Sequence, residues 1–273
     1  MISDWAFSFV AMANLPLTGR HALIGGASRG IGRATALALA EAGADCTLLG
    51  RTPETLSSVM AELKDHGGQQ HAMLVADQLE LEDLALKVKM TAKSRPIHIW
   101  INNTGGPKGG PLHKAGVSEL EAAFRQHILA AQTILQEVLE GMQAAEYGRI
   151  INVISTSVKQ PIPGLGVSNT IRAAMGNWAK TLAGELGASG ITVNNVLPGF
   201  TNTGRLNEII ESRASAQGKT TDQIAEGMKS GVPAGRFAEP SETATAITFL
   251  ASPAASYING INLPVDGGRT KSL

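Results

Sequence analysis

The chain of 273 residues contains one cysteine, few aromatic side chains and no net charge. Cys46 has no second thiol with which to form an internal disulfide or a cysteine metal site, and its apolar neighbours predict a buried, inert thiol. Lys and Arg number 23, as do Asp and Glu, so bulk charge does not favour nucleic acid or anionic lipid. We therefore expect neither nucleic acid nor a membrane as partner, but a diffusible small-molecule substrate.

Long apolar runs and a basic, cleavable N-terminal leader are also lacking, which predicts a cytoplasmic protein without a membrane span. The histidines show no metal-ligand spacing with Cys or acidic residues, so no metal is expected. Residues 1–14 carry several aromatic side chains ahead of a second methionine, Met12. This extension is interpreted as a misassigned start or an added leader.

From residue 20 onward, apolar runs of strand length alternate with longer segments of helical period. This alternation is typical of βαβ units around a parallel sheet, with helices on both faces. It predicts a single α/β domain over residues 15–273, a Rossmann-type doubly wound sheet of about seven parallel strands. The strands are expected to begin near His21, Asp45, Gln70, Ile97, Arg149, Ile191 and Ile261.

Local signals mark two helix starts and one irregular segment. Thr52 followed by Pro53 reads as an N-cap before a first helical residue, while Ser118 and Glu121 have the spacing of a capping box. Residues 200–237 break the alternation, and we expect a partly helical lid over the carboxyl ends of the strands.

The first expected strand runs directly into a glycine-rich turn at residues 25–32, and an alanine-rich helix follows. Glycines let the backbone approach a pyrophosphate closely, and the free amides and positive dipole end of a helix attract the anion. In this context the turn predicts a dinucleotide site. The alternative is a tight strand-to-helix turn that binds nothing.

These residues resemble the short-chain dehydrogenase/reductase superfamily, and its 3-oxoacyl-ACP-reductase-like members in particular. The glycine motif departs from the usual Thr-Gly-x-x-x-Gly-x-Gly only at Gly25, and the similarity extends to residues 102–105, Pro198-Gly199 and 266–268. By that resemblance Asp77 and Asn103 flank the adenosine, and 198–201 lie beside the nicotinamide. The implied cofactor residues are Gly26, Ser28, Arg29, Gly30, Ile31, Gly32, Arg51, Asp77, Gln78, Asn103, Gly105, Arg172, Pro198, Gly199 and Thr201.

Charge at the second strand favours NADP(H) over NAD(H). An NAD site usually places a carboxylate there for the ribose hydroxyls, whereas this strand ends in Gly50-Arg51, and Arg29 lies in the glycine turn. A guanidinium can bind a 2′-phosphate through two hydrogen bonds, and a carboxylate would repel it. Alternatively, Arg51 is a solvated loop charge.

The resemblance implies a catalytic serine, a tyrosine and a lysine four residues after the tyrosine. Ser155 occupies the serine position, but Ser168 and Arg172 stand where tyrosine and lysine are usual. An alkyl hydroxyl is much harder to ionise than a phenol, and arginine does not release its proton near neutral pH. Cofactor binding should survive this change better than proton transfer.

Two other residues are candidate proton sources. His127 occupies the place of an asparagine that usually helps to hold a relay water, and histidine titrates in the useful range. If the strand stays extended beyond Ser155, then Ser157 and Lys159 project to the same side as Ser155. The alternatives are a structural histidine and a solvated loop lysine.

The leading hypothesis is an NADP(H)-dependent oxidoreductase that interconverts a small carbonyl and alcohol with a nonstandard proton donor. A nonredox isomerase, dehydratase or lyase on the same fold remains open, as does a catalytically silent NADP-binding sensor or scaffold. A homotetramer or homodimer is expected, because the superfamily associates through helices whose counterpart here is rich in apolar residues: Ala173, Ala174, Met175, Trp178, Ala179 and Leu182.

Overall fold

The computed structural model describes residues 15–272, so the expected extension at 1–14 lies outside the described residues. Seven parallel strands form one sheet in the order β3-β2-β1-β4-β5-β6-β7. Each begins within two residues of its expected start, which confirms the predicted α/β fold. The strands are β1 His21–Gly25, β2 Asp45–Gly50, β3 Ala72–Val75, β4 Ile99–Asn102, β5 Gly148–Val153, β6 Ile191–Pro198 and β7 Asn262–Val265.

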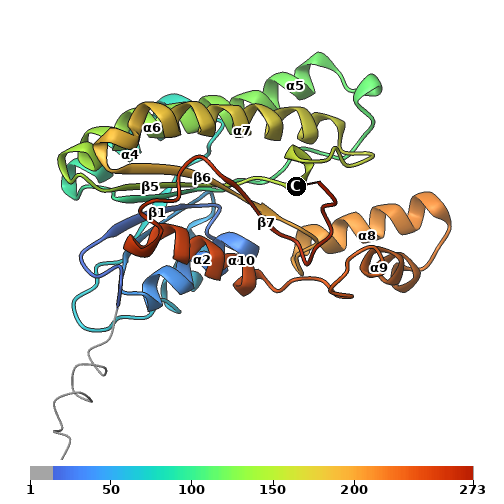
Figure 1. Ribbon diagram of the computed structural model, residues 1–273, viewed down its shortest axis with the longest axis horizontal. Helices are drawn as coiled ribbons and strands as arrows, with labels where there is room; N and C mark the ends of the chain where they lie inside the picture. The colour runs from blue at the N-terminus through green and yellow to red at the C-terminus, as the bar shows by residue number, and fades with distance from the viewer. Residues whose placement is uncertain (1–14, 273) are drawn as a thin grey trace, which may run out of the picture.

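Helices cover both faces of the sheet, with α4, α6 and α7 on one face and α2 and α10 on the other (Figure 1). The nine α-helices of the described residues are α2 Gly30–Glu41, α3 Pro53–Met60, α4 Leu81–Ser94, α5 Val117–Phe124, α6 Ala130–Ala144, α7 Gly166–Leu186, α8 Gly204–Gln217, α9 Thr221–Lys229 and α10 Pro240–Ala251.

The two faces have separate hydrophobic cores. Successive side chains of a strand point to opposite faces, and β4 illustrates this directly. Ile99 and Ile101 pack with α2, α3 and α10, whereas Trp100 packs with α4, α6 and α7. Since the strands are buried on both sides, they appear in the sequence as continuous apolar runs.

Of the two predicted helix starts, one is confirmed and the other is wrong. Thr52 takes the N-cap position of α3 and Pro53 its first residue, as predicted, although no side-chain hydrogen bond caps the helix. The capping box at Ser118 is wrong, because α5 begins one residue earlier, at Val117. The backbone N–H of Gly116 donates instead to Glu119 Oε1 at 3.0 Å, and the cap is displaced by two residues.

The segment 200–237 is partly helical, as expected, and contains α8 and α9. These two helices lie beside the main body of the molecule (Figure 1). They have a small core of their own, which consists of Leu206, Ile210, Ala214, Ile224 and Met228. Motion of this segment as a lid stays a prediction.

Across residues 15–272, the helices lack the combined length and apolar character that a membrane crossing requires. The same part of the chain contains no group of three or more His, Cys, Asp or Glu side chains that could hold a metal ion.

A row of asparagine side chains joins four neighbouring strands. Asn102 Nδ2 donates to Asn152 Oδ1 at 2.8 Å, Asn152 Nδ2 donates to Asn195 Oδ1 at 2.9 Å, and Asn195 Nδ2 donates to Asn262 Oδ1 at 2.8 Å. Asn152 has no exposed surface, so both of its hydrogen bonds satisfy groups that water does not reach. The row ties β4, β5, β6 and β7 together across the sheet, from the last residue of β4 to the first residue of β7.

We expect Asn152→Ala to lower the free energy of unfolding by about 2–4 kcal/mol, because it leaves one buried donor and one buried acceptor without partners. Asn262→Ala, at the half-buried end of the row, should cost about 1 kcal/mol. Urea unfolding followed by circular dichroism measures both values. Equal losses in the free energy of unfolding would contradict the prediction that the buried centre of the row stabilises the fold more than its half-buried end.

Candidate active site

A cleft of about 490 Å³ lies at the carboxyl ends of the strands. All the expected cofactor residues except Gly32 line it, and so do three expected catalytic residues, Ser155, Ser168 and Arg172. Parallel strands place their carboxyl ends at one edge, which is how segments distant in sequence meet here.

The turn after β1 requires glycine at its several positions for different structural reasons. Gly26 and Gly30 both have φ of +57°, a conformation that side chains other than glycine rarely adopt. A Cβ at Gly32 would overlap the carbonyl oxygen of Gly26 and crowd the side-chain amide of Asn103. Gly32 therefore permits close packing beneath the turn and does not itself line the cleft.

The N-terminus of α2 suits an anion. Its N-cap residue, Arg29, provides no side-chain hydrogen bond to the first amides, and the first turn has no acidic residue. The first N–H groups of a helix have no partner within the helix, and the dipole end is positive. With the close backbone approach at Gly26 and Gly30, the turn fits the pyrophosphate of a dinucleotide.

Two arginines lie at this end of the cleft. Arg51 directly follows β2, and its side chain is 73% exposed. Its Nη1 lies 3.8 Å from Asp77 Oδ2, a long and solvent-accessible ion pair that a phosphate can displace. Arg29 also lines the cleft, so both expected 2′-phosphate ligands lie where the sequence placed them.

Ser155 lies just beyond the end of β5. Its backbone is extended, and its Oγ accepts a hydrogen bond from the N–H of Ser157 at 3.1 Å. The hydroxyl proton of Ser155 therefore remains able to face the cleft. The condition for that alignment is not met, because β5 ends at Val153 and a 3₁₀ turn follows at Thr156–Val158. That turn abolishes the period-two alignment, and Lys159 does not line the cleft.

Ser168 and Arg172 lie in the first turns of α7, four residues apart and so on one face of the helix. The guanidinium of Arg172 donates from Nη1 to the carbonyl oxygen of Val153 at 3.0 Å. Its residue is only 8% exposed, and burial lowers the pKa of the guanidinium to about 10. Arg172 is thus a cation at physiological pH, held against the strand that leads to Ser155.

His127 is buried, and the expectation that it titrates in the useful range is wrong. Burial, and secondarily the charge of Arg172, lowers its pKa to about 2, so the imidazole is neutral at physiological pH. Nε2 has no hydrogen-bond partner among the described residues, and His127 does not line the cleft. It lies in a single π-helical turn, Arg125–Leu129, which alters the helix register. The neighbouring Gln126 lines the cleft instead and donates to Thr104 Oγ1 at 3.0 Å.

Neither of the two tyrosines supplies the missing phenol. The hydroxyl of Tyr147 donates to the carbonyl oxygen of Ala251 at 2.7 Å, and Tyr257 is fully exposed. Neither one lines the cleft.

Sequence reasoning missed several polar residues of the cleft, and they are Gln126, Thr156, Thr203, Arg205, Glu208 and Arg269. Arg205 lies in α8, pairs with Glu208 at 3.0 Å and donates to the carbonyl oxygen of Pro107 at 3.0 Å. Arg269 follows the turn 266–268, whose motif the sequence had already singled out. That motif could have indicated that Arg269 lies near the cleft, whereas no motif in the sequence indicated Arg205.

The fold and the cleft together define a dinucleotide-binding α/β protein, with the glycine turn at the first strand and the catalytic candidates at the carboxyl edge. A family described as Enoyl-(Acyl carrier protein) reductase matches residues 26–270. The chain belongs to this family, within the short-chain dehydrogenase/reductase superfamily, which confirms the predicted class of enzyme.

Relatives agree in sequence and in structure. The chain is 35% identical to the 3-oxoacyl-(acyl-carrier-protein) reductase FabG of Vibrio harveyi, over 92% of this chain and 98% of that protein. It is 29% identical to the NADPH-dependent reductase BacG of Bacillus subtilis, over 94% of this chain and all of that protein.

Among solved structures, YwfH, an NADPH-dependent reductase involved in bacilysin biosynthesis, has a TM-score of 0.88 at 29% identity and covers 93% of this chain and 99% of its own. L-sorbose reductase from Gluconobacter frateurii, complexed with NADPH and L-sorbose, also has a TM-score of 0.88, at 28% identity over 95% of this chain and all of its own.

The buried imidazole predicts an acid-sensitive fold. Below pH 6.5 the unfolded chain binds a proton at His127 that the folded protein does not, so the free energy of unfolding falls by about 1.4 kcal/mol per pH unit from this group. His127→Asn should remove that dependence between pH 6.5 and pH 4.5. His113→Asn, which deletes an exposed imidazole, is the matched control. Chemical unfolding at several pH values measures the slopes, and equal slopes for His127→Asn and the wild type would contradict the buried neutral imidazole.

Proposed function

We propose that this protein is an NADPH-dependent reductase of small carbonyl compounds whose active site lacks the usual tyrosine. One observation carries the proposal: a single cleft joins the glycine turn and the Arg29 and Arg51 guanidiniums to Ser155 and Arg172. Relatives described as NADPH-dependent reductases support both the cofactor and the direction.

The glycine turn and Arg51 would hold NADPH, which when bound would supply the hydride for carbonyl reduction. The hydroxyl of Ser155 donates a hydrogen bond to the carbonyl oxygen, because the contact with Ser157 uses its oxygen as an acceptor and leaves the O–H proton free. Arg172 provides a fixed positive charge for the oxyanion that develops as the hydride arrives. Its low exposure strengthens this interaction, since little water competes for the charge.

The proton for that oxyanion comes from water by way of Ser168. Ser168 lines the cleft one helical turn from Arg172, where its hydroxyl can donate to the oxyanion and recover a proton from solvent. The buried neutral His127 and the excluded Lys159 are less suited to this transfer. A hydroxyl donor of high pKa makes proton transfer slow, so we expect low turnover on generic ketones.

The missing phenol keeps a nonredox lyase, dehydratase or isomerase as the second candidate. Such an enzyme would use Arg172 and Ser155 to stabilise an oxyanion without net hydride transfer. Turnover without a change in the absorbance of the reduced nicotinamide would favour it, whereas tight cofactor binding without any turnover would favour a silent binding protein.

We also propose that the protein forms a homotetramer or homodimer. Of the apolar residues on α7, Met175 and Ala179 are buried in the core and leave only part of that stripe available. Other exposed apolar side chains lie on the same side of the sheet, on α4 and at the ends of the π-turn: Leu86, Met90, Phe124 and Leu129.

We expect the protein to oxidise NADPH in the presence of carbonyl compounds, and Arg172→Met to lower kcat by about 100-fold, because the oxyanion loses its fixed cation. Arg172→Lys should retain much more activity. Steady-state assays that follow the reduced nicotinamide measure both effects. If no member of a panel of small ketones, aldehydes and oxo acids is reduced, the reductase proposal fails.

The cofactor preference should depend on Arg51. Arg51→Met removes a phosphate ligand and should weaken NADPH binding by about 10- to 100-fold, while NADH binding changes little. Arg33→Met, an exposed arginine outside the cleft, is the control. Calorimetric titration with both cofactors decides the point, and an unchanged preference in Arg51→Met would contradict this role.

A further inference from the structure

The cleft has an excess of positive charge that the rest of the chain does not share. Five arginines and two carboxylates line it, although the whole chain has no net charge. Arg29, Arg51 and Asp77 lie at the end that fits the cofactor phosphates. The remaining charged residues are Arg172, Arg205, Glu208 and Arg269, and Glu208 pairs with Arg205. Two cations therefore remain without an ion pair.

These two cations contact the chain just before and just after Ser155. Arg172 donates to the carbonyl oxygen of Val153, two residues before it, and Arg269 Nη1 lies 3.4 Å from the hydroxyl of Thr156, the residue after it. Within the described residues, no carboxylate lies within ion-pair distance of either guanidinium. Arg269 thus belongs to the reacting end of the cleft and not to the glycine turn.

The structure holds Arg269 in place by its backbone and its side chain. Asp266 accepts hydrogen bonds from the N–H groups of Gly268 at 3.0 Å and Thr270 at 2.8 Å, which fixes the turn that carries Arg269. The guanidinium stacks on the ring of Phe200, 4.3 Å from its centroid. Burial lowers the pKa of Arg269, and the charge of Asp266 opposes that shift.

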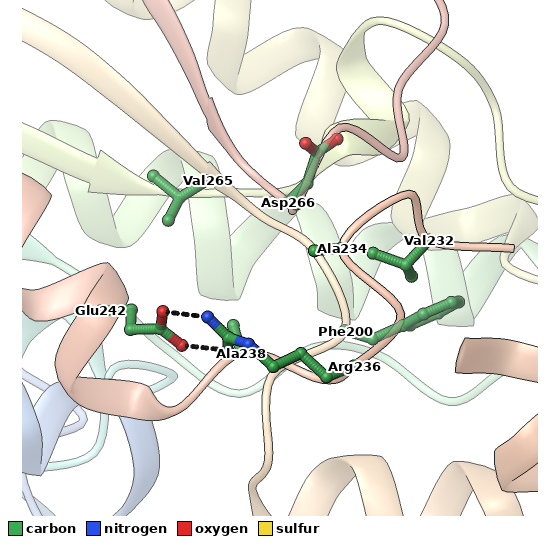
Figure 2. Close-up of a pocket in the computed structure, with 9 residues that line it drawn as sticks. Phe200, Val232, Ala234, Arg236, Ala238, Glu242, Val265 and Asp266 are labelled. Carbon is green, nitrogen blue, oxygen red and sulfur yellow. Dashed lines mark hydrogen bonds and ion pairs between the residues drawn. The ribbon is translucent and has the colours of Figure 1, made fainter. Parts of the chain in front are cut away.

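Phe200, on which the guanidinium of Arg269 stacks, has further contacts with its surroundings. Phe200 and Asp266 border a small cavity of about 70 Å³ that Arg236 and Glu242 also line, and Arg236 forms two hydrogen bonds to Glu242, each 2.7 Å long (Figure 2). The N–H of Ala238 donates to the carbonyl oxygen of Phe200 at 2.8 Å. The turn at Asp266 and the ring of Phe200 therefore position the guanidinium of Arg269 before a ligand binds, which lowers the entropy lost on binding.

We infer that the substrate carries an anionic group, a carboxylate or a phosphate, which binds Arg269 while its carbonyl lies at Ser155 and Arg172; this inference rests on the proposed reductase function. A partly buried guanidinium without an ion pair has lost hydration that a charged ligand restores. A guanidinium binds carboxylate and phosphate equally well in geometry, through two parallel hydrogen bonds. Arg172 stabilises the reacting oxygen, and Arg269 selects the substrate.

The test compares carbonyl compounds that differ only in the anionic group. The probes are 4-oxopentanoate beside its methyl ester, and dihydroxyacetone phosphate beside dihydroxyacetone. In the wild type, one anionic member should exceed its neutral partner in kcat/KM by at least about tenfold. Arg269→Met should lower kcat/KM for that anion by about 10- to 100-fold and leave the neutral partner nearly unchanged.

Control variants distinguish the effect of the lost charge from effects on folding and on cofactor binding. Arg269→Lys should restore part of the preference, and Lys271→Met, which removes an exposed cation two residues away, should leave it unchanged. Thermal unfolding and NADP⁺ titration of each variant show whether the fold and the cofactor site are intact. If Arg269→Met weakens NADP⁺ binding as much as it lowers turnover of the anion, Arg269 serves the cofactor and the inference is wrong.

The two proposals can fail separately. If the neutral partners are reduced as well as the anions, the reductase stands and the inference is wrong. If no probe is reduced, the proposed function fails for these compounds, and calorimetric binding of the same anions to the NADP⁺ complex tests Arg269 directly. Binding that Arg269→Met weakens would support an anion site, whereas equal binding or none would overturn it.

Discussion

The structure depends on one geometric constraint, the parallel direction of all seven strands. Because every strand ends at the same edge of the sheet, the segments that follow all seven strands contribute residues to one cleft. The asparagine row from Asn102 to Asn262 joins four of these strands to one another through side-chain hydrogen bonds. The positions of the catalytic candidates follow from that shared edge.

The charged residues of this cleft differ from those that the superfamily usually has at the same positions. A tyrosine and lysine pair can share a proton near neutral pH, whereas Ser168 and Arg172 cannot do so in the same way. Arg172 remains charged despite its burial, which suits a fixed electrostatic role beside the reacting oxygen. In the proposed reductase, the site stabilises negative charge through Arg172 and moves a proton by another route than the tyrosine and lysine pair.

The cofactor half of the site could be predicted from the sequence, and the catalytic half only in part. The glycine turn at Gly26 and Gly30 works through local backbone geometry, which a motif specifies. Gly32 is a partial exception, since it packs beneath the turn. His127 could not be placed by counting, because a π-helical turn shifts the helix register and presents Gln126 to the cleft.

The sequence by itself determined the sheet, the order of its elements and the dinucleotide turn, because apolar period and glycine spacing act over short stretches of chain. Only the tertiary structure decided which charged groups face the cleft. The 3₁₀ turn after Ser155 removed Lys159 from it, and the turn fixed by Asp266 brought Arg269 to Thr156 from 113 residues away. Such placements depend on packing between distant segments, which no local pattern in the sequence records.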